Sequence, residues 1–140
     1  MDFRPLTTAE VAYRNSGIAG AQTMLNAKGP LPVAGVQAIF DWCRAQNLPA
    51  DRLHNHRAVV SLGMAYGDVL ARELKLVWAW CQDGDLAHLV VRPPDRLVAI
   101  WPVFMICRRL LSPEDTTIAG MIGVVRNTIA GLDTGNQSAS

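Results

Sequence analysis

The feature that most limits the fold is a hairpin signal between two segments that look like strands. Residues 76–81 are rich in aromatic and β-branched residues, Asp83-Gly84 is a dipeptide typical of a two-residue β-turn, and the second segment runs over 86–92. A Pro-Pro-Asp-Arg turn then leads to a third apolar segment at 97–101. The sequence therefore predicts a three-stranded antiparallel β-meander.

The two faces of this sheet follow from the turn. If Asp83-Gly84 occupies it, Gln82 pairs with Asp85 and Trp80 with Ala87, and the pairing decides which side chains share a face. The first predicted face holds Leu76, Trp78, Trp80, Leu89, Val91, Val98 and Ile100, and the second holds Val77, Ala79, Cys81, Leu86, His88, Val90, Ala99 and Trp101. Both faces are apolar, whereas a small sheet with one wet side alternates apolar and polar residues. Either helices cover the second face, or it docks a second copy of the chain, as a homodimer, or another protein.

Helical signals precede the hairpin. Thr7 and Glu10 form a capping box, and the first helix ends before Lys28-Gly29-Pro30. A second helix begins near Pro32, and a third runs over about 56–74. The second helix places on one side Val33, Val36, Ile39, Phe40 and Cys43, with Trp42 beside this stripe. The third is apolar on more than one side, which is typical of a central helix.

Two glycines lie four positions apart in the third predicted helix. Gly63 and Gly67 share a helix face, where missing side chains let another backbone approach closely. We expect tight packing against a neighbouring element at this strip. A ligand groove over the strip is the alternative.

The C-terminal part predicts a short helix, or a single turn of one, at 103–111 and a last helix after it. Ser112-Pro113 followed by two acids is one predicted start of the last helix, and Thr116 or Thr117 is the alternative. Gly131-Leu132 is its predicted end. The predicted architecture is α+β: N-terminal helices, the meander, and one or two C-terminal helices packed on the sheet. We expect a single domain over 1–132 and a flexible tail over 133–140.

Length and charge narrow the class of protein. The chain has 140 residues, which fits one domain, and 13 basic against 12 acidic side chains leave no electrostatic signal for nucleic acid or an acidic membrane. The longest apolar run, 97–107, is too short to span a membrane. Met1-Asp2-Phe3-Arg4-Pro5 lacks the features of an export signal, so we expect a cytoplasmic protein. Cys43, Cys81 and Cys107 are odd in number and widely spaced, which predicts reduced, buried thiols.

The order of motifs from residue 62 to residue 132 resembles a known family. Leu62-Gly63, Gly67-Asp68-Val69-Leu70 and a Trp-containing strand lead through the Asp83-Gly84 turn to Ile100-Trp101-Pro102. The basic pair Arg108-Arg109, the acidic Glu114-Asp115 and a final apolar helix follow. This pattern is similar to an uncharacterised bacterial domain-of-unknown-function family of small α/β proteins. Some members resemble immunity-type proteins encoded near toxin genes, and the resemblance implies no catalytic residues.

Side chains that carry chemistry do not form a catalytic pattern. His54 and His56, with Asp51 nearby, could supply two metal ligands only on a loop or strand, and we expect a polar loop and helix start there. Ser61 lacks the glycines of a nucleophile elbow. A Cys81–His88 pair is expected to be silent, because apolar surroundings raise the thiol pKa. The sequence thus predicts no catalytic, cofactor or metal residues.

Two functions of different class remain. The first is a non-enzymatic protein-interaction module, in its specific form an immunity protein that blocks a bacterial effector toxin. Its predicted partner-binding residues are His88 and Trp101 on the second sheet face and Asp83 and Asp85 at the turn. The second is a small ligand-binding domain or hydrolase with a pocket between helices and sheet. That pocket would be lined by Trp78, Trp80 and Tyr66 and polarised by Asp68 or Arg72.

Overall fold

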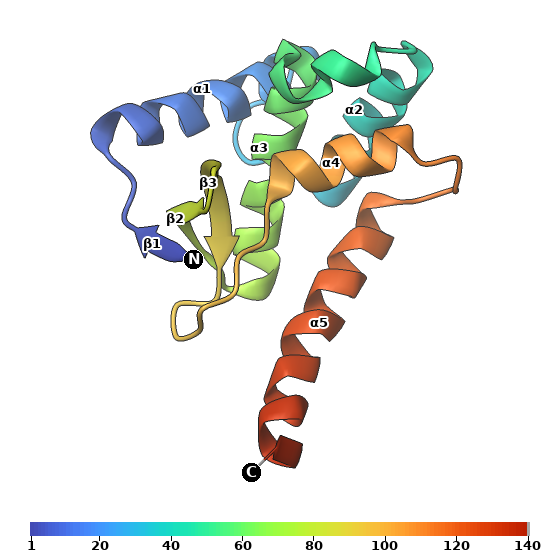
Figure 1. Ribbon diagram of the computed structural model, residues 1–140. Helices are drawn as coiled ribbons and strands as arrows, with labels where there is room; N and C mark the ends of the chain where they lie inside the picture. Colours follow the sequence, from blue (N-terminus) through green and yellow to red (C-terminus); the bar gives the residue numbers. More distant parts are fainter. Residues whose placement is uncertain (140) are drawn as a thin grey trace.

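The protein is an α+β fold arranged around one central helix. The computed structural model describes the backbone of residues 1–139 and the side chains of residues 1–132. Figure 1 shows α3 running through the middle of the molecule, with the sheet and the other helices arranged around it. The helices are α1 (Thr8–Met24), α2 (Val33–Ala45), the 3-10 helix η1 (Ala50–Asn55), α3 (Arg57–Leu74), α4 (Pro102–Leu111) and α5 (Ile118–Ala139). The predicted central position of the third helix is confirmed, because α3 contacts α1, α2, α4, α5, η1 and β3.

The starts of α1 and α3 are set by side chains that accept backbone hydrogen bonds. Thr7 Oγ1 accepts from the Glu10 amide at 3.2 Å, and the Glu10 carboxylate accepts from the Thr7 amide at 2.8 Å. This is the predicted capping box. At α3, His56 Nδ1 accepts from the Ala58 amide at 3.2 Å, so His56 caps the helix at the helix start that the sequence predicts.

Glu10 also joins α1 to the first strand, β1 (Asp2–Arg4). Its carboxylate accepts from the Arg4 guanidinium at 2.7 and 2.8 Å, and this bond, with the Thr7 contacts, lowers the pKa of Glu10 to about 2. A carboxyl with a lower pKa in the folded state stabilises the fold above its unfolded pKa, and the contribution is lost as the pH falls towards the folded value.

We expect Glu10→Gln to lower the free energy of unfolding by about 1 kcal/mol near neutral pH, since the pair is exposed on the Arg4 side. The difference from the wild type should shrink as the pH falls from about 5 to about 2. Urea unfolding at several pH values measures both effects. Glu73→Gln is the matched control, because exposed Glu73 forms no ion pair within residues 1–132. A difference that stays constant with pH would contradict the charge argument.

The glycine strip of α3 is a packing surface, as predicted. A Cβ placed on Gly63 would lie 2.7 Å from Val103 Cγ2 and 2.8 Å from Val103 Cα. A Cβ on Gly67 would lie 2.5 Å from Trp78 Cη2. Real Cβ atoms do not approach other heavy atoms this closely, so α4 and the sheet lie on α3 only because these side chains are absent.

The three-stranded antiparallel sheet is confirmed, but one strand differs from the prediction. β1 pairs with β2 (Val77–Asp83), and β2 pairs with β3 (Leu86–Arg92), in the order β1-β2-β3. Residues 97–101 were predicted as the third strand and instead form a single bridge, between Ile100 and Val91. The bridge cannot extend, because Trp101 caps α4 and Pro102, the first residue of α4, has no amide to donate. The N-terminal segment provides the third strand.

The turn of the hairpin is displaced from the predicted position. Asp83 pairs with Leu86, so Gly84 and Asp85 form the two-residue loop, and Gly84 has φ +60°. A positive φ at the first loop position is what a type II′ turn requires of glycine. The pairing is therefore shifted by two residues, and Trp80 lies opposite Leu89 rather than Ala87. A shift of two keeps every side chain on its predicted face, because side chains alternate with a period of two.

The two sheet faces are covered differently. The first face lies on α3 and α4, with Leu89 buried beside Met64 and Val103. On the second face, a buried group of Ala79, Cys81 and Val90 is covered by three partly buried residues, Phe3, Ala99 and Trp101. The cover of this group thus comes from β1 and from the segment before α4, and Phe104 at the start of α4 adds a ring contact with His88 on the same face. Val77 and Leu86 at its margin stay exposed.

The last helix starts and ends differently from the first prediction. α5 begins at Ile118, near the alternative start, because Gln37 Oε1 accepts from the Ile118 amide at 2.7 Å and Thr117 Oγ1 from the Gly120 amide at 3.0 Å. Ser112-Pro113 lies outside α5. The backbone of α5 continues beyond Gly131-Leu132 to Ala139, and of the predicted tail only Ser140 lies outside the described residues. Figure 1 shows the C-terminal half of α5 leaving the body of the molecule.

The C-terminal helices pack against α3. Their predicted packing on the sheet is confined to the start of α4, where Val103 is buried with Leu89 and Phe104 contacts His88. This arrangement leaves the two C-terminal helices with a surface that faces neither α3 nor the sheet.

Candidate functional site

An apolar groove of about 590 Å³ lies between α4, α5 and the segment that bridges β3 to α4. We call it the α4–α5 groove. Its apolar walls are Leu86, Trp101, Phe104, Met105, Val124 and Val125. Leu86 is 45% exposed and Val124 54% exposed. Side chains of this kind at the rim of a hollow mark a surface that can bind an apolar partner.

The first wall of the groove is an aromatic cluster. The ring of Phe104 lies 5.4 Å from that of His88, edge to face, and 5.9 Å from that of Trp101. The structure therefore brings His88 and Trp101, both predicted as partner-binding residues, into contact with one phenyl ring. His88 is half-buried, and burial lowers its pKa, which favours the neutral imidazole.

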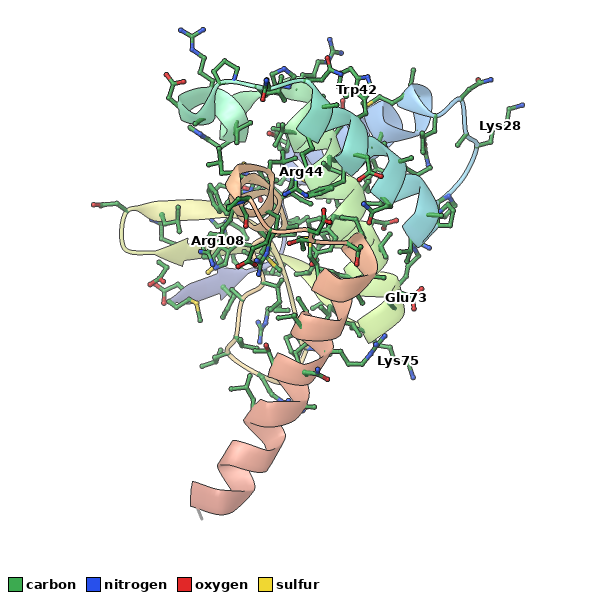
Figure 2. The ribbon with its side chains drawn as sticks, turned by 90° about the vertical axis from the view of Figure 1, so that its right-hand side faces the viewer. Lys28, Trp42, Arg44, Glu73, Lys75 and Arg108 are labelled. Carbon is green, nitrogen blue, oxygen red and sulfur yellow. The ribbon has the colours of Figure 1, made fainter. Side chains whose placement is uncertain are left out.

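The polar residues that line the groove are two arginines and Thr128, whose hydroxyl donates to the Val124 carbonyl at 2.8 Å. Arg108 and Arg109, at the end of α4, line it, and neither forms an ion pair with a side chain of the described residues. Figure 2 shows Arg108 beside the sheet, well away from Trp42 on α2. An unpaired guanidinium on an apolar wall favours a carboxylate on whatever fills the groove.

The acidic turn lies next to the groove. Asp83 and Asp85 are exposed and form no ion pair within residues 1–132, and Leu86, which follows them, lines the groove. Gln82 Nε2 donates to the Gly84 carbonyl at 2.6 Å and stiffens the turn. Of the predicted site residues, Trp101 lines the groove and His88 contacts the Phe104 ring beside it, while Asp83 and Asp85 lie in the turn next to Leu86.

Below the groove, Tyr66 holds a polar atom in the core. Tyr66 is fully buried, and its hydroxyl has no hydrogen-bond partner among the described residues. Burial raises the pKa of Tyr66, and the Arg109 guanidinium offsets a smaller part of that rise, so the hydroxyl lies within electrostatic reach of the groove arginine.

Tyr66→Phe is expected to raise the free energy of unfolding by about 1 kcal/mol, because it removes an unpartnered buried hydroxyl and keeps the ring. The midpoint of urea unfolding measures the change. The exposed Tyr13→Phe is the matched control and should change little. A loss of stability in Tyr66→Phe would mean that the hydroxyl is hydrogen bonded in the native protein.

Side chains fill the space between helices and sheet in which the sequence analysis places a pocket. Tyr66 is buried, Trp78 lies directly on Gly67, and Asp68 accepts from Arg72 at 3.3 Å on the surface. Arg72 also donates to the Leu31 carbonyl at 2.6 Å. The polar pair therefore ties α3 to the loop before α2 instead of pointing into a pocket.

The geometry does not support a reactive Cys81–His88 pair or a metal site. Cys81 lies directly opposite His88, closer than predicted, but burial raises the pKa of Cys81 and keeps it a thiol. Burial also raises the pKa of Cys43 to about 11. All three cysteines are free, and Cys107 is only partly buried. In the described part of the chain, no three His, Cys, Asp or Glu side chains gather as a metal site would require.

Sequence reasoning did not assign Phe104, Val124 or Arg109 to a binding surface. Phe104 and Val124 belong to separate helices, and nothing local in the chain indicates that these helices flank one groove. The basic pair Arg108-Arg109 was visible as a motif, and its position at the end of a short amphipathic helix was the available signal.

Comparison with known proteins places the chain in a family. Residues 45–125 match the model of the domain of unknown function DUF3806, from the end of α2 to the first turns of α5. The match begins before residue 62 and ends before residue 132, so it is displaced from the stretch that the motifs indicated. No curated protein and no solved structure matches the chain. None of the helices, as far as the structure describes them, is long and apolar enough to cross a membrane. Since the family model covers more than half of its 140 residues, the chain belongs to the DUF3806 family of domains of unknown function.

Proposed function

We propose that this protein is a non-enzymatic interaction module that binds a partner protein in the α4–α5 groove. The observation that carries the proposal is the groove itself, an apolar hollow with exposed Leu86 and Val124 at its rim and two arginines without ion-pair partners in the described chain. Aromatic and arginine side chains in one desolvated patch are typical of the residues that contribute most to protein binding.

The charges around the groove define the partner. An occupant needs an apolar ridge to contact Phe104 and Val124, carboxylates to face Arg108 and Arg109, and a basic group to face the acidic turn. A partner segment with apolar and acidic residues on one side, such as an amphipathic helix, meets the first two needs. Its basic surface beyond the groove would meet the third.

Peptide selection tests the groove as a binding site. Random peptides selected on the wild-type protein should be enriched in sequences that combine large apolar residues with Asp or Glu. A selected peptide, made synthetically, should bind Val124→Asp and Arg109→Glu with a dissociation constant at least about tenfold higher than the wild type. A tenfold change corresponds to one lost contact of about 1.4 kcal/mol. Val124 is exposed, so its substitution leaves the core intact. Val77→Asp is the matched control, because Val77 is also exposed and does not line the groove.

Other outcomes would remove the proposal. Selected peptides that are basic, or that bind equally well to Val124→Asp, would show that the groove is not the site. A concentration-dependent dimer in gel filtration that Val124→Asp dissociates would make a second copy the occupant instead.

The specific form of the proposal is an immunity protein whose partner is a bacterial effector toxin. Three free cysteines suit a reducing compartment, so we place the interaction in the cytoplasm. If a gene for an effector lies beside the gene of this protein, co-expression should protect growth and Val124→Asp should abolish the protection. Groove-dependent peptide binding without protection would leave an interaction module that is not an immunity protein.

A further inference from the structure

A second hollow lies on a different surface, where α1 crosses the start of α3. It has two parts of about 310 and 430 Å³, which share Gly20, Arg57 and Ser61 and therefore form one continuous depression. We call it the α1–α3 hollow. None of the residues that line it carries a carboxylate. It shares no lining residue with the α4–α5 groove.

Glycines of α1 form the floor of this hollow. A Cβ on Gly20 would lie 2.6 Å from Ser61 Oγ, and a Cβ on Gly17 would lie 2.7 Å from Met64 Cγ. The backbone of α1 thus passes close to α3. Because Gly20 has no side chain, it does not cover the Ser61 hydroxyl.

Ser61 is the buried polar group of the hollow. It is only 7% exposed, it lines both parts, and its hydroxyl forms no hydrogen bond with the described residues. Serine and threonine hydroxyls inside helices commonly bond to a carbonyl one turn back, as Thr23 Oγ1 does to Ala19 O at 3.0 Å. The Ser61 hydroxyl thus opens into the hollow without an internal partner, so it is free to donate a hydrogen bond to a ligand atom there.

The charge of the hollow is positive. Arg57, the first residue of α3, lines both parts and forms no ion pair within the described chain. It stands at the positive end of an 18-residue helix, where an anion is stabilised by the helix dipole and by free amides. Ser61 lies one turn further along the same helix, so both groups can serve one oxyanion.

Each part of the hollow is lined by one exposed aromatic residue. Trp42 lines the larger part with Met24, and Tyr13 lines the smaller part; each residue is 48% exposed. Arg57 and Ser61 line both parts of the hollow. A ligand ring stacked on Trp42 or on Tyr13 therefore has the Arg57 guanidinium within the same hollow. Flat apolar rings bind to such faces by stacking.

We propose that the α1–α3 hollow binds a small aromatic compound that carries an oxyanion, with the oxyanion at Arg57 and Ser61 and the ring against Trp42. Arg57 forms charge-assisted hydrogen bonds to the oxyanion, and the Ser61 hydroxyl donates a further one. The chemistry is shared by aryl phosphates and aryl carboxylates, and the larger part of the hollow, about 430 Å³, has room for one ring with its substituent.

Titrations followed by backbone amide NMR test this site with phenyl phosphate and benzoate as probes. At least one of the two should shift the amides of α3 near Arg57 and the side-chain signal of Trp42, with a dissociation constant of about 1 mM or below. The probe that binds more tightly distinguishes phosphate from carboxylate. Phenol, which has the ring without the charge, and inorganic phosphate, which has the charge without the ring, should each bind at least about tenfold more weakly.

Variants distinguish a loss of binding at the site from a loss of stability of the fold. Ser61→Ala and Arg57→Gln should each weaken the better probe about tenfold or more, and exposed Trp42→Ala should do the same without changing stability. Arg52→Gln is the matched control, because Arg52 lies in η1 next to the hollow and does not line it. The proposal is overturned if neither probe binds, if phenol or inorganic phosphate binds as tightly as the better probe, or if Arg57→Gln behaves like Arg52→Gln.

Discussion

Phe40→Ala is expected to lower the free energy of unfolding by about 3–5 kcal/mol, because it deletes a large ring from a close-packed site. Phe40 is fully buried on α2 and belongs to the main core with Ile39 and Leu70. The surrounding helices α2 and α3 cannot collapse into the space, since their backbones are held by other contacts of the same core. Urea unfolding followed by far-UV circular dichroism measures the loss.

Trp42→Ala is the matched control for this prediction. Trp42 lies two positions further along α2, and its ring is half exposed. Its removal should cost less than about 1 kcal/mol, although tryptophan is the larger side chain, because little packing is lost. Equal losses in the two variants would mean that the outer face of α2 is covered in solution.

Gly63→Ala should destabilise the protein by about 2–3 kcal/mol, although alanine is a better helix former than glycine by about 1 kcal/mol. The new methyl group would lie 2.7 Å from Val103 Cγ2 and 2.8 Å from Val103 Cα. A side chain could rotate away, but Cα belongs to the backbone of α4. The substitution must therefore push α4 off α3, and thermal and urea unfolding measure the cost.

Two further variants test that reason. Gly123→Ala in α5 should raise stability by about 0.5–1 kcal/mol, because a Cβ there meets no atom within 4 Å and the helix propensity is gained. Val103→Ala should not rescue Gly63→Ala, since the contact with the Val103 backbone remains. Rescue by Val103→Ala would show that only the side chains conflict.

The position of α4 links this packing to the proposed interaction. Phe104, Met105 and Arg109 of α4 line the α4–α5 groove, and α4 lies where Gly63 allows it to lie. A displaced α4 should weaken peptide binding even though Gly63 is not in the groove. The glycine strip of α3 is thus a structural requirement of the groove rather than a site of its own.

Local patterns in the chain were sufficient for most elements. The capping box at Thr7, the apolar stripe of α2 and the bounds of α3 agree with the structure, because each depends on residues within a few turns of one another. The hairpin was predicted with its register shifted by two residues, and the faces were still correct. The period of two in a strand makes face assignment insensitive to an even shift.

Local patterns do not predict contacts between segments that are distant in the chain. The local patterns of the chain indicate an α+β protein with a central glycine-bearing helix and a sheet that is apolar on both faces. Three features became apparent only from the folded chain: β1 supplies the third strand, the segment 97–101 forms one bridge and covers part of the second face, and α4 and α5 enclose a groove. Strand pairing and helix packing depend on complementary shape between residues far apart in the chain, which no local period encodes.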